Sequence, residues 1–517
     1  MKGLLSGCFA LVGLLALGQT APDPDRLIAI FVIDGLRPDS INTADTPTIA
    51  RLRTEGVDYV NSHSIFPTST RVNAASLATG TYPARHGIVG NSMFVSGVNG
   101  QAPLDTGDYR QLLRLEEAEG RVVTTPTLGE ILQRNGRRLV TVSSGTTGNG
   151  FLLNPEARHG AGVAIHGLFD PGKTAAYPAE ISDAVIGRFG SPPPDPDDIG
   201  QMDWTDTVLR DYVLPELRPD VVIDWMGPLD AAQHDHGVGS TEAKTALGAI
   251  DKSLSRTLAA MQALTPVRRI DIVVTSDHGF AQHTSGVNVV DSLIAAGVKA
   301  NAASQDVIVA SQGQSVLFYV ASHDGRDIAR LVAFLQQQPW VDVVFTRGGR
   351  QGLGSVPGTF SLDVTQGSHA SRSPDVAVTL KWTSNRNPHG VPGTQTIISG
   401  KTGPLTGAAS GHGGLSPWVV HNTLVLWGDD FKAGARVTAP ASLADLMPTV
   451  LSVLAVAADP CDQACGRVLH ESLRRSPDRT LTPTRRTVTT KSGAYRAALR
   501  ISSVAGHDYV DEGARQR

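Results

Sequence analysis

Six side chains able to bind a divalent metal ion stand at the ends of apolar runs, or in a turn after one. They are the carboxylates and imidazoles of Asp34, Asp230, His234, Asp277, His278 and His412. Parallel strands present ligands just beyond their carboxyl ends, so four such ends predict one shared site. Carboxylates and imidazoles without thiolates favour a catalytic Zn, Mn or Fe site over a structural one.

The number of ligands predicts two ions instead of one. Two ions about 3.5–4 Å apart can hold both the attacking and the leaving oxygen of an in-line displacement at phosphorus. In such a site catalysis consists mostly of positioning and charge stabilisation. The ligand set therefore predicts phosphoryl-transfer chemistry.

Thr70 stands between a Pro turn and the small-residue run AASLATG, which predicts a short buried helix. Taken alone, such a Thr is most often an N-cap that accepts a hydrogen bond from the first helical turn. A helix N-terminus also binds phosphate through its free N–H groups and its dipole. A Thr hydroxyl is a poor nucleophile unless it is activated, and the predicted metal ions supply that activation.

The composition is that of an ordinary globular protein. The chain has 517 residues, of which 18% are charged and 41% hydrophobic. A net charge of −4 argues against a basic surface that coats nucleic acid or an acidic membrane. An aromatic content of 5% argues against a platform for stacking single-stranded bases.

Three continuous apolar runs end abruptly in Asp and His, as parallel strands buried on both faces do. They begin at Arg26, Pro219 and Arg269. Helical periodicity over residues 241–264 predicts a crossover between two of them. Strands that alternate with helices predict an α/β fold with a doubly wound, mostly parallel central sheet and helices on both faces.

We expect a catalytic domain over residues 26–455. Within it, residues 289–402 alternate short strands with one clear helix and predict a small inserted α+β subdomain. Residues 92–125 and 155–200 are rich in Gly, Pro and Asp and predict long loops or insertions. Residues 456–517 predict a strand-forming C-terminal appendix.

The first residues, 1–21, have the anatomy of a secretory signal peptide, with one Lys, a short apolar run and small residues. The apolar run is short for a transmembrane span, so we expect an exported protein, periplasmic or secreted, without a transmembrane anchor. In such a protein Cys461 and Cys465 of CDQAC predict a local disulfide, with two free thiols as the alternative.

The order of these motifs resembles the nucleotide pyrophosphatase/phosphodiesterase family of the alkaline phosphatase superfamily. The motifs are Asp34, PTSTxxN, TGxYPxxHGIVGN, DxxxH, SDHGF and GHGGLSP, from about Arg26 to Leu454. The resemblance implies an alkaline phosphatase-like fold and two Zn²⁺ ions, one bound by Asp34, Thr70, Asp277 and His278 and the other by Asp230, His234 and His412. It also implies that Asn91 donates a hydrogen bond to a phosphoryl oxygen.

The same resemblance implies a small phosphate-ester substrate and a phosphothreonine intermediate formed on Thr70. Arg71 departs from the family pattern, in which an aromatic residue follows the nucleophile and stacks on a base. Arg71 is interpreted as a contact to an anionic substrate or as a solvated side chain. Lys is absent from 139–172, which favours a diester over a monoester. His236 and His283 match no ligand position.

Several alternatives remain at this point. A phosphonate hydrolase or a phosphomonoesterase would use the same scaffold and metals. A sulfatase needs Cys or Ser at the nucleophile position, and TSTRVN has Thr70 there. Outside the enzymes, the alternative is a metal-dependent binding protein, although no ligand and no nucleophile is missing. The sequence does not predict the oligomeric state.

Overall fold

The computed structural model describes residues 26–516 except 171–173, 196–197, 265–267, 406, 408, 458–460, 462–463 and 477–480. The expected signal peptide at residues 1–21 lies outside these described residues. Within them, none of the helices has the length and apolar character that crossing a lipid bilayer requires.

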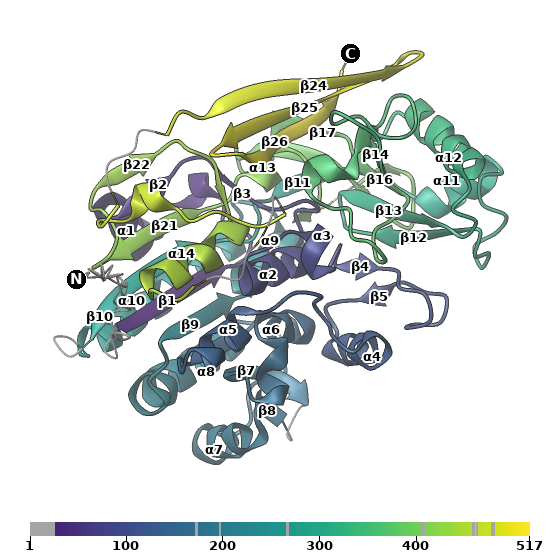
Figure 1. Cartoon of the computed structure of the whole chain (residues 1–517). Helices are drawn as coiled ribbons and strands as arrows, with labels where there is room; N and C mark the ends of the chain where they lie inside the picture. Colours follow the sequence, from purple (N-terminus) through teal and green to yellow (C-terminus); the bar gives the residue numbers. More distant parts are fainter. Residues whose placement is uncertain are drawn as a thin grey trace, which may run out of the picture.

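A nine-stranded sheet forms the centre of the fold (Figure 1). Its order is β22-β2-β21-β10-β1-β9-β6-β7-β8. The inner strands β10, β1, β9, β6 and β7 are parallel, whereas β21 and β8 run antiparallel to their inner neighbours. The strands span Arg26–Ile33 (β1), Val57–Tyr59 (β2), Leu139–Ser143 (β6), Val163–Asp170 (β7), Thr174–Tyr177 (β8), Val221–Met226 (β9), Arg269–Thr275 (β10), Leu424–Gly428 (β21) and Ala435–Val437 (β22).

Helices cover both faces of this sheet, because alternate side chains of its strands enter two separate cores. In β1, Ile28, Ile30 and Val32 pack into one core, while the residues between them pack into the other. The first core includes α2 (Thr70–Thr79), α5 (Leu128–Arg134) and α6 (Thr147–Leu153). The second includes α1 (Pro47–Glu55), α8 (Ile199–Val208) and α10 (Thr241–Gln262). The predicted α/β class with a mostly parallel, doubly wound sheet is confirmed.

The prediction of long loops over residues 92–125 and 155–200 is wrong in part. The first segment contains α4 (Tyr109–Glu119), which Asp108 caps by accepting a hydrogen bond from the Arg110 N–H. The second contains β7, an inner strand of the central sheet, and α7 (Ala179–Phe189). Gly and Pro are concentrated in the connections, so composition averaged over the whole segment hides the short apolar runs between them.

A second five-stranded sheet of order β12-β13-β16-β14-β15 lies beside the central one, at the right of Figure 1. Its strands are Val307–Ser311 (β12), Ser315–Val320 (β13), Val341–Thr346 (β14), Phe360–Ser361 (β15) and Val376–Leu380 (β16), and α11 (Val289–Ala295) and α12 (Gly325–Gln337) accompany them. The next strands, β17 (Trp382–Arg386) and β18 (Pro392–Ile398), form a separate sheet with β11 (Ala281–Val287).

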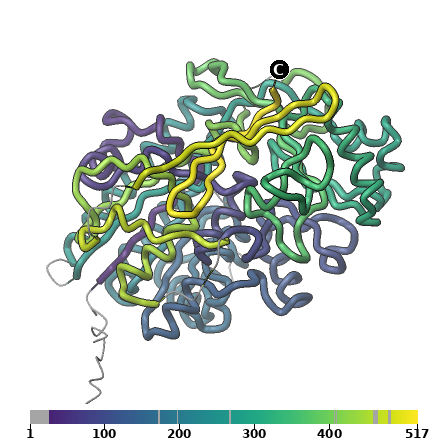
Figure 2. Tube along the Cα trace, turned by 45° about the horizontal axis from the view of Figure 1, so that its top comes forward, coloured from purple at the N-terminus to yellow at the C-terminus, as the bar shows by residue number. Residues whose placement is uncertain are grey.

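The C-terminal segment forms an antiparallel sheet of β24 (Thr484–Ser492), β25 (Tyr495–Val504) and β26 (His507–Arg515). Figure 2 shows it, in yellow, lying across the top of the molecule over both the central region and the second sheet. The Tyr495 hydroxyl anchors it by donating a hydrogen bond to the Asp342 carbonyl, with an O···O distance of 2.7 Å. Cys461 and Cys465 are joined in the expected disulfide.

The remaining strands and helices, 3-10 helices aside, are short. They span Ser62–His63 (β3), Pro83–His86 (α3), Ser92–Met93 (β4), Leu104–Asp105 (β5), Leu209–Leu217 (a π-helical continuation of α8), Pro228–His236 (α9), Gly403–Pro404 (β19), Ser410–Gly411 (β20), Pro417–Val420 (α13), Ala441–Ser442 (β23) and Leu446–Val453 (α14).

Two carboxyl groups face each other in the second core. Asp224 of β9 and Asp206 of α8 are both fully buried, and Ser253 of α10 donates a hydrogen bond to Asp206. Burial raises the pKa of Asp224 to about 7. Burial and the charge of Asp224 raise the pKa of Asp206 as well. Two adjacent buried carboxylates cannot both ionise at low cost, so the folded protein retains a proton here.

We therefore expect Asp224→Asn to change how stability depends on pH. Unfolded Asp224 loses its proton near pH 3.8 and folded Asp224 only near 7, so wild-type stability falls over that interval and then levels off. The fall is up to about 1.4 kcal/mol per pH unit relative to the variant. Urea unfolding between pH 4.5 and 8 measures it. The control, Asp203→Asn, changes an exposed carboxylate of α8, the helix that carries Asp206. Equal slopes for wild type and Asp224→Asn would contradict the prediction.

Candidate active site

Three neighbouring parallel strands deliver the predicted ligands to one edge of the central sheet. Asp34 follows β1, and Asp277 and His278 follow β10. Asp230 and His234 lie on α9, directly after β9, and point the same way because they are four residues apart on one helix. His412 follows β20, which pairs with β11. The order β10-β1-β9 makes these carboxyl ends adjacent, so the structure brings all six side chains together.

One cluster of ligand atoms surrounds His278. Its Nε2 lies 3.0 Å from Asp277 Oδ2, 3.4 Å from Asp34 Oδ1 and 3.9 Å from Asp230 Oδ1. The ligand atoms of Asp34, Asp230 and His278 lie within 4.8 Å of one another. Thr70 joins this cluster, since its Oγ1 is 3.2 Å from His278 Nε2.

A second cluster lies next to the first and shares Asp230 with it. The Nε2 of His234 is 3.5 Å from Asp230 Oδ2, and the Nε2 of His412 is 3.8 Å from Asp230 Oδ1. The His412 and His278 rings stack at a centroid distance of 3.5 Å, which connects the two clusters. The shared carboxylate places the two groups of ligands side by side, as a two-ion site requires.

The three imidazoles are oriented in the same way by backbone carbonyls. Each Nδ1 lies within hydrogen-bonding distance of a carbonyl oxygen: 2.9 Å for His234 to Ser410, 3.1 Å for His278 to Gly279 and 2.8 Å for His412 to Thr68. Donation by Nδ1 leaves the lone pair of Nε2 directed at the carboxylates. This arrangement is typical of metal-binding histidines, whose other nitrogen is held by a hydrogen bond.

The buried carboxylates have too few hydrogen-bond donors for their charge. Within the described residues, no hydrogen bond reaches Asp230 Oδ1 or Asp277 Oδ2. Burial opposes ionisation of Asp277, but the adjacent His278 imidazole brings the pKa of Asp277 below its usual range. Burial lowers the pKa of His412 far below its usual value, as do the neighbouring imidazoles. Buried carboxylate oxygens without hydrogen-bond donors are costly unless a cation compensates them, so this donor set fits divalent metal ions.

Thr70 is the first residue of α2 and is 4% exposed. Ser69 occupies the N-cap position, so the interpretation of Thr70 as the N-cap is wrong. The predicted short buried helix is confirmed, and it ends at Gly80, whose φ of +62° a residue with a Cβ adopts only with strain. With no capping role, the Thr70 hydroxyl is directed at the first cluster.

Asn91 is held beside Thr70 by the backbone of Arg71. The Arg71 N–H donates to Asn91 Oδ1 at 3.0 Å. In the part of the chain that the structure describes, no hydrogen bond reaches the Asn91 amide nitrogen. The amide is therefore oriented through its oxygen, and its N–H groups are the donors left for a ligand.

The Arg71 side chain extends from the same helical turn. Its buried Nε has no hydrogen-bond partner among the described residues. A Cβ at Gly107 would lie 2.5 Å from Arg71 Nη2, so the guanidinium packs closely against this glycine. A partly buried guanidinium without a carboxylate partner can bind an anion.

Two other histidines lie near the site without facing the clusters. His236 is exposed at the end of α9. His283 is buried, and burial together with the charge of His234 lowers its pKa to about 3. A Cβ at Gly411 would lie 2.6 Å from His283 Nε2, so this ring packs behind the strand that precedes His412.

Some residues of the site carry no signal in the sequence. The Trp225 indole N–H donates to Asp34 Oδ2 at 2.9 Å, and the Gly35 N–H donates to Asp277 Oδ1 at 3.1 Å. Phe280 places its ring 4.9 Å from that of His234. A Trp inside an apolar strand and a Gly after an Asp have ordinary structural explanations, and only the assembled sheet reveals these contacts.

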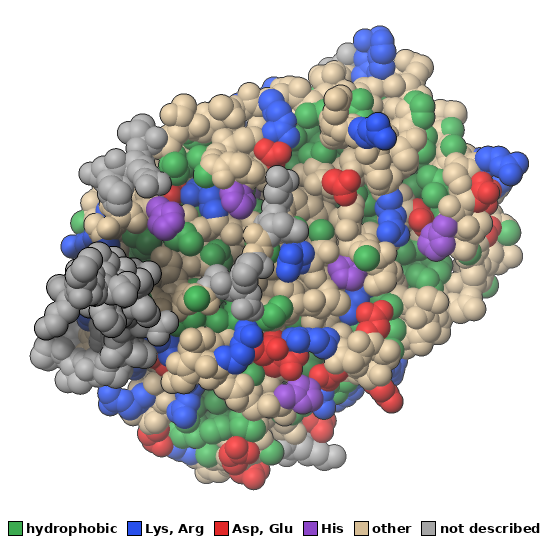
Figure 3. Space-filling model, viewed as in Figure 1, with side chains coloured by type: hydrophobic (Ala, Val, Ile, Leu, Met, Phe, Trp, Pro, Cys, Tyr) green, Lys and Arg blue, Asp and Glu red, His purple; other side chains and the backbone are tan. Residues whose placement is uncertain are grey.

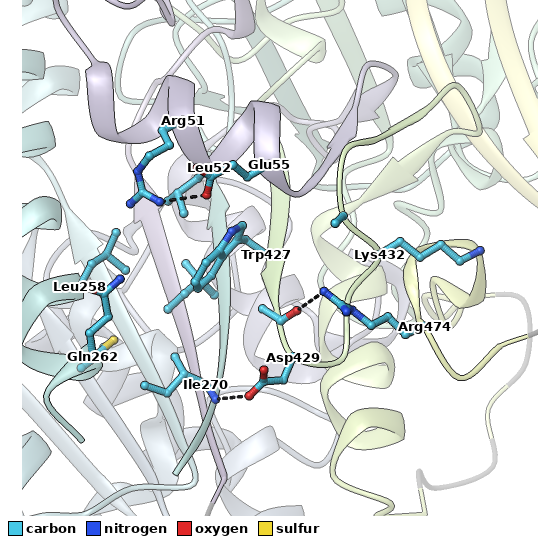
Figure 4. A pocket seen from close by; sticks show the side chains of 14 residues that line it. Arg51, Leu52, Glu55, Leu258, Gln262, Ile270, Trp427, Asp429, Lys432 and Arg474 are labelled. Atoms are coloured by element: carbon cyan, nitrogen blue, oxygen red, sulfur yellow. Dashed lines mark hydrogen bonds and ion pairs between the residues drawn. The ribbon is translucent and has the colours of Figure 1, made fainter. Parts of the chain in front are cut away.

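A separate cavity of about 230 Å³ lies near the amino end of β10, between α1, α10 and β21 (Figure 4). Leu52, Leu258 and Ile270 line it, and Trp427 projects into it. No His is among its lining residues in the described chain, and the cavity lies at the end of β10 that is opposite the ligands.

On the face shown in Figure 3, Lys and Arg side chains are interspersed with Asp and Glu.

The sheet, the ligand clusters at its carboxyl edge and the buried Thr are the arrangement of an alkaline phosphatase-like fold. The profile of the family described as Type I phosphodiesterase / nucleotide pyrophosphatase matches residues 28–395. The chain belongs to this family. The matched range includes Thr70, Asn91 and every predicted ligand except His412.

Similar proteins include human ectonucleotide pyrophosphatase/phosphodiesterase family member 1, which is 24% identical over 49% of this chain and 23% of its own length. Venom phosphodiesterase of Macrovipera lebetinus is 22% identical over 49% of this chain and 26% of its own. The chain thus matches about a quarter of the length of these relatives.

Two solved structures share the fold over 85% of this chain and 97% of their own. Phosphonoacetate hydrolase from Sinorhizobium meliloti, in complex with phosphonoacetate, has a TM-score of 0.60 at 20% identity. Murine ectonucleotide pyrophosphatase/phosphodiesterase 5 has a TM-score of 0.57 at 14% identity, and an inactive variant of that protein is solved in complex with AMP.

We expect Trp225→Phe to weaken metal binding without unfolding the protein. The substitution keeps the ring in the core but removes the hydrogen bond that orients Asp34. Loss of such an outer hydrogen bond typically lowers metal affinity by about 10- to 100-fold. Competition with a zinc chelator measures the affinity. The control is Trp382→Phe, whose indole N–H donates to Gly513 in the C-terminal sheet; equal affinities in the two variants would contradict the role of Trp225.

Proposed function

We propose that this chain is an exported, two-metal hydrolase of phosphate diesters or pyrophosphates in which Thr70 is the nucleophile. The observation that carries the proposal is the pair of Asp/His clusters sharing Asp230, with the Thr70 hydroxyl 3.2 Å from His278 Nε2. The expected signal peptide and the Cys461–Cys465 disulfide support export.

The donor chemistry and the orphaned carboxylate oxygens fit two divalent ions, with zinc favoured by the imidazoles. Asp34, Asp277 and His278 would hold one ion together with Thr70, and Asp230, His234 and His412 would hold the other. When bound, the ions lower the pKa of the attacking hydroxyl and stabilise the charge of the leaving oxygen.

The residues of the chain act in two displacements. Thr70 Oγ1 gives its proton to solvent and forms a bond to phosphorus, while the bond from phosphorus to the leaving oxygen breaks and its electron pair stays on that oxygen; the product is a phosphothreonine. Water then loses a proton and attacks phosphorus from the side that the leaving group has vacated, and the bond from phosphorus to Thr70 Oγ1 breaks, so that this oxygen takes up a proton again. The Asn91 amide N–H groups donate to a phosphoryl oxygen during both steps. The Arg71 N–H takes no direct part, since it is already bonded to Asn91.

The named activities of the relatives, pyrophosphatase and phosphodiesterase, support a diester or pyrophosphate substrate. The residue next to the nucleophile is Arg71, where the family pattern has an aromatic residue that stacks on a nucleobase. We therefore propose a small phosphate ester that does not depend on a nucleobase for binding.

A phosphonate hydrolase is the second candidate. The fold resembles phosphonoacetate hydrolase over 85% of this chain, and the Arg71 guanidinium has no ion-pair partner among the described residues. A guanidinium beside the reacting group suits a substrate with a second anionic group, such as a carboxylate.

We expect Thr70→Ala to lose nearly all hydrolysis while folding normally. Removal of a covalent nucleophile costs at least about a thousandfold in kcat. Thr70→Ser should keep part of the activity, because it retains a hydroxyl at the same place. Thr54→Ala, on the exposed face of α1, serves as the control. Hydrolysis of bis-p-nitrophenyl phosphate in the zinc-loaded proteins is the measurement, and an unchanged rate in Thr70→Ala would remove this residue as nucleophile.

A substrate panel with and without Arg71→Ala distinguishes the two candidates. The panel is bis-p-nitrophenyl phosphate, p-nitrophenyl phosphate and phosphonoacetate, each with zinc and with chelator. We expect the diester to be the best substrate, chelator to abolish its turnover, and Arg71→Ala to change its kcat/KM less than about threefold, since the diester has no second anion to pair.

Phosphonoacetate as the best substrate, with a loss of about tenfold or more in Arg71→Ala, would instead favour the phosphonate hydrolase. Turnover of no substrate after zinc is restored would reject both enzymes in favour of a metal-dependent binding protein.

A further inference from the structure

A second group of metal-binding side chains lies away from the active site, where the C-terminal sheet meets the rest of the chain. His63 of β3, His421 directly after α13 and Asp511 of β26 each offer a ligand atom, and these atoms lie within 4.8 Å of one another. Two imidazoles and one carboxylate are a common ligand set for Zn²⁺ and similar ions. None of these residues takes part in the chemistry proposed above.

The two imidazoles are oriented by backbone carbonyls, as the imidazoles of the active site are. The Nδ1 of His63 lies 3.2 Å from the Ala441 carbonyl oxygen, and the Nδ1 of His421 lies 3.3 Å from that of Ser62. Donation to these carbonyls leaves the Nε2 lone pairs for a ligand. The Nε2 of His63 lies 2.8 Å from Asp511 Oδ1, so either a bound cation or a proton on Nε2 would join the two groups.

Asp511 is also held in place. The Ser502 hydroxyl lies 2.9 Å from both of its carboxylate oxygens, and the two residues are on neighbouring strands of the C-terminal sheet. His63 is only 2% exposed, so the ligands converge at a largely buried point. A hydrogen bond to a ligating carboxylate is a usual part of a metal site.

A cavity of about 450 Å³ opens beside His421 and Asp511 and gives room for a further ligand such as water. Three arginines also line it, and two of them are neutralised: Arg486 lies 2.7 Å from Asp508, and Arg500 lies 3.1 Å from Glu512. The third, Arg485, has no ion pair within the described residues, and its charge suits an anion such as chloride or hydroxide in the open position.

The position of this group in the chain gives it a structural role. β3 leads into α2, which begins with Thr70, and α13 follows the turn that carries His412. His63 and His421 are paired in a β-bridge, and β26 contacts both β3 and α13 (Figure 1). An ion held here would join the C-terminal sheet to the two segments that bear the nucleophile and a ligand of the active site.

We propose that His63, His421 and Asp511 form a third metal site, which takes Zn²⁺ or a similar transition ion and fastens the C-terminal sheet to the catalytic region.

The test counts bound zinc in wild type, His421→Gln and the control His389→Gln, which changes an exposed histidine. Each full-length protein is stripped with chelator, reloaded with zinc, desalted and measured by mass spectrometry. We expect His421→Gln to hold one equivalent fewer than both wild type and the control. Chelator should also lower the Tm of wild type more than that of His421→Gln. Asp511→Asn is the second variant and should show the same loss.

Equal zinc counts in wild type and His421→Gln would overturn the proposal and leave a histidine–carboxylate ion pair as the explanation. If both variants fold poorly, an anomalous diffraction map of zinc-loaded wild type replaces the zinc count. A peak within bonding distance of the three side chains would support the proposal, and the lack of such a peak would overturn it. The comparison counts ions and does not measure hydrolysis, so the failure of the proposed diesterase activity would not alter its outcome.

Discussion

The structure depends on the convergence of buried hydrogen-bond acceptors at one edge of the central sheet. Three parallel strands end in Asp34, Asp277 and the helix that bears Asp230, and their carboxylates converge on imidazoles whose lone pairs point inward. Acceptors that converge in a buried space repel one another, and the described residues supply few donors to compensate. Binding of cations would relieve this repulsion, and the relief contributes to the free energy of metal binding. Part of the metal affinity therefore comes from the way the fold brings the acceptors together.

The parallel sheet is what makes this convergence possible. Strands β10, β1 and β9 are neighbours in space although they are far apart in the sequence, and each ends at the same edge. Their buried, apolar character on both faces fixes the positions of the residues that follow, since the packed cores leave little room for a shift. The site is thus held by strands that are packed on both faces.

Much of the fold and the convergence of the six candidate ligands could be predicted from the sequence, because both depend on local patterns. An apolar run that ends in Asp or His is visible in one dimension, as are the helix that follows Thr70 and the order of the motifs. Three features could not be predicted, since they depend on contacts across the chain. The indole N–H of Trp225 reaches Asp34 only because β9 pairs with β1. The strand β7 lies in a segment whose glycines indicate loops. The N-cap of α2 is Ser69 and not Thr70.

The hydrogen bond between the Arg71 N–H and Asn91 Oδ1 has an evolutionary consequence. The donor is a backbone group, so any residue but proline at position 71 can keep the Asn91 amide in place beside the nucleophile. The side chain at this position is left out of that bond. In the proposed mechanism, selection could therefore exchange the residue next to the nucleophile without disturbing the amide that serves the reaction.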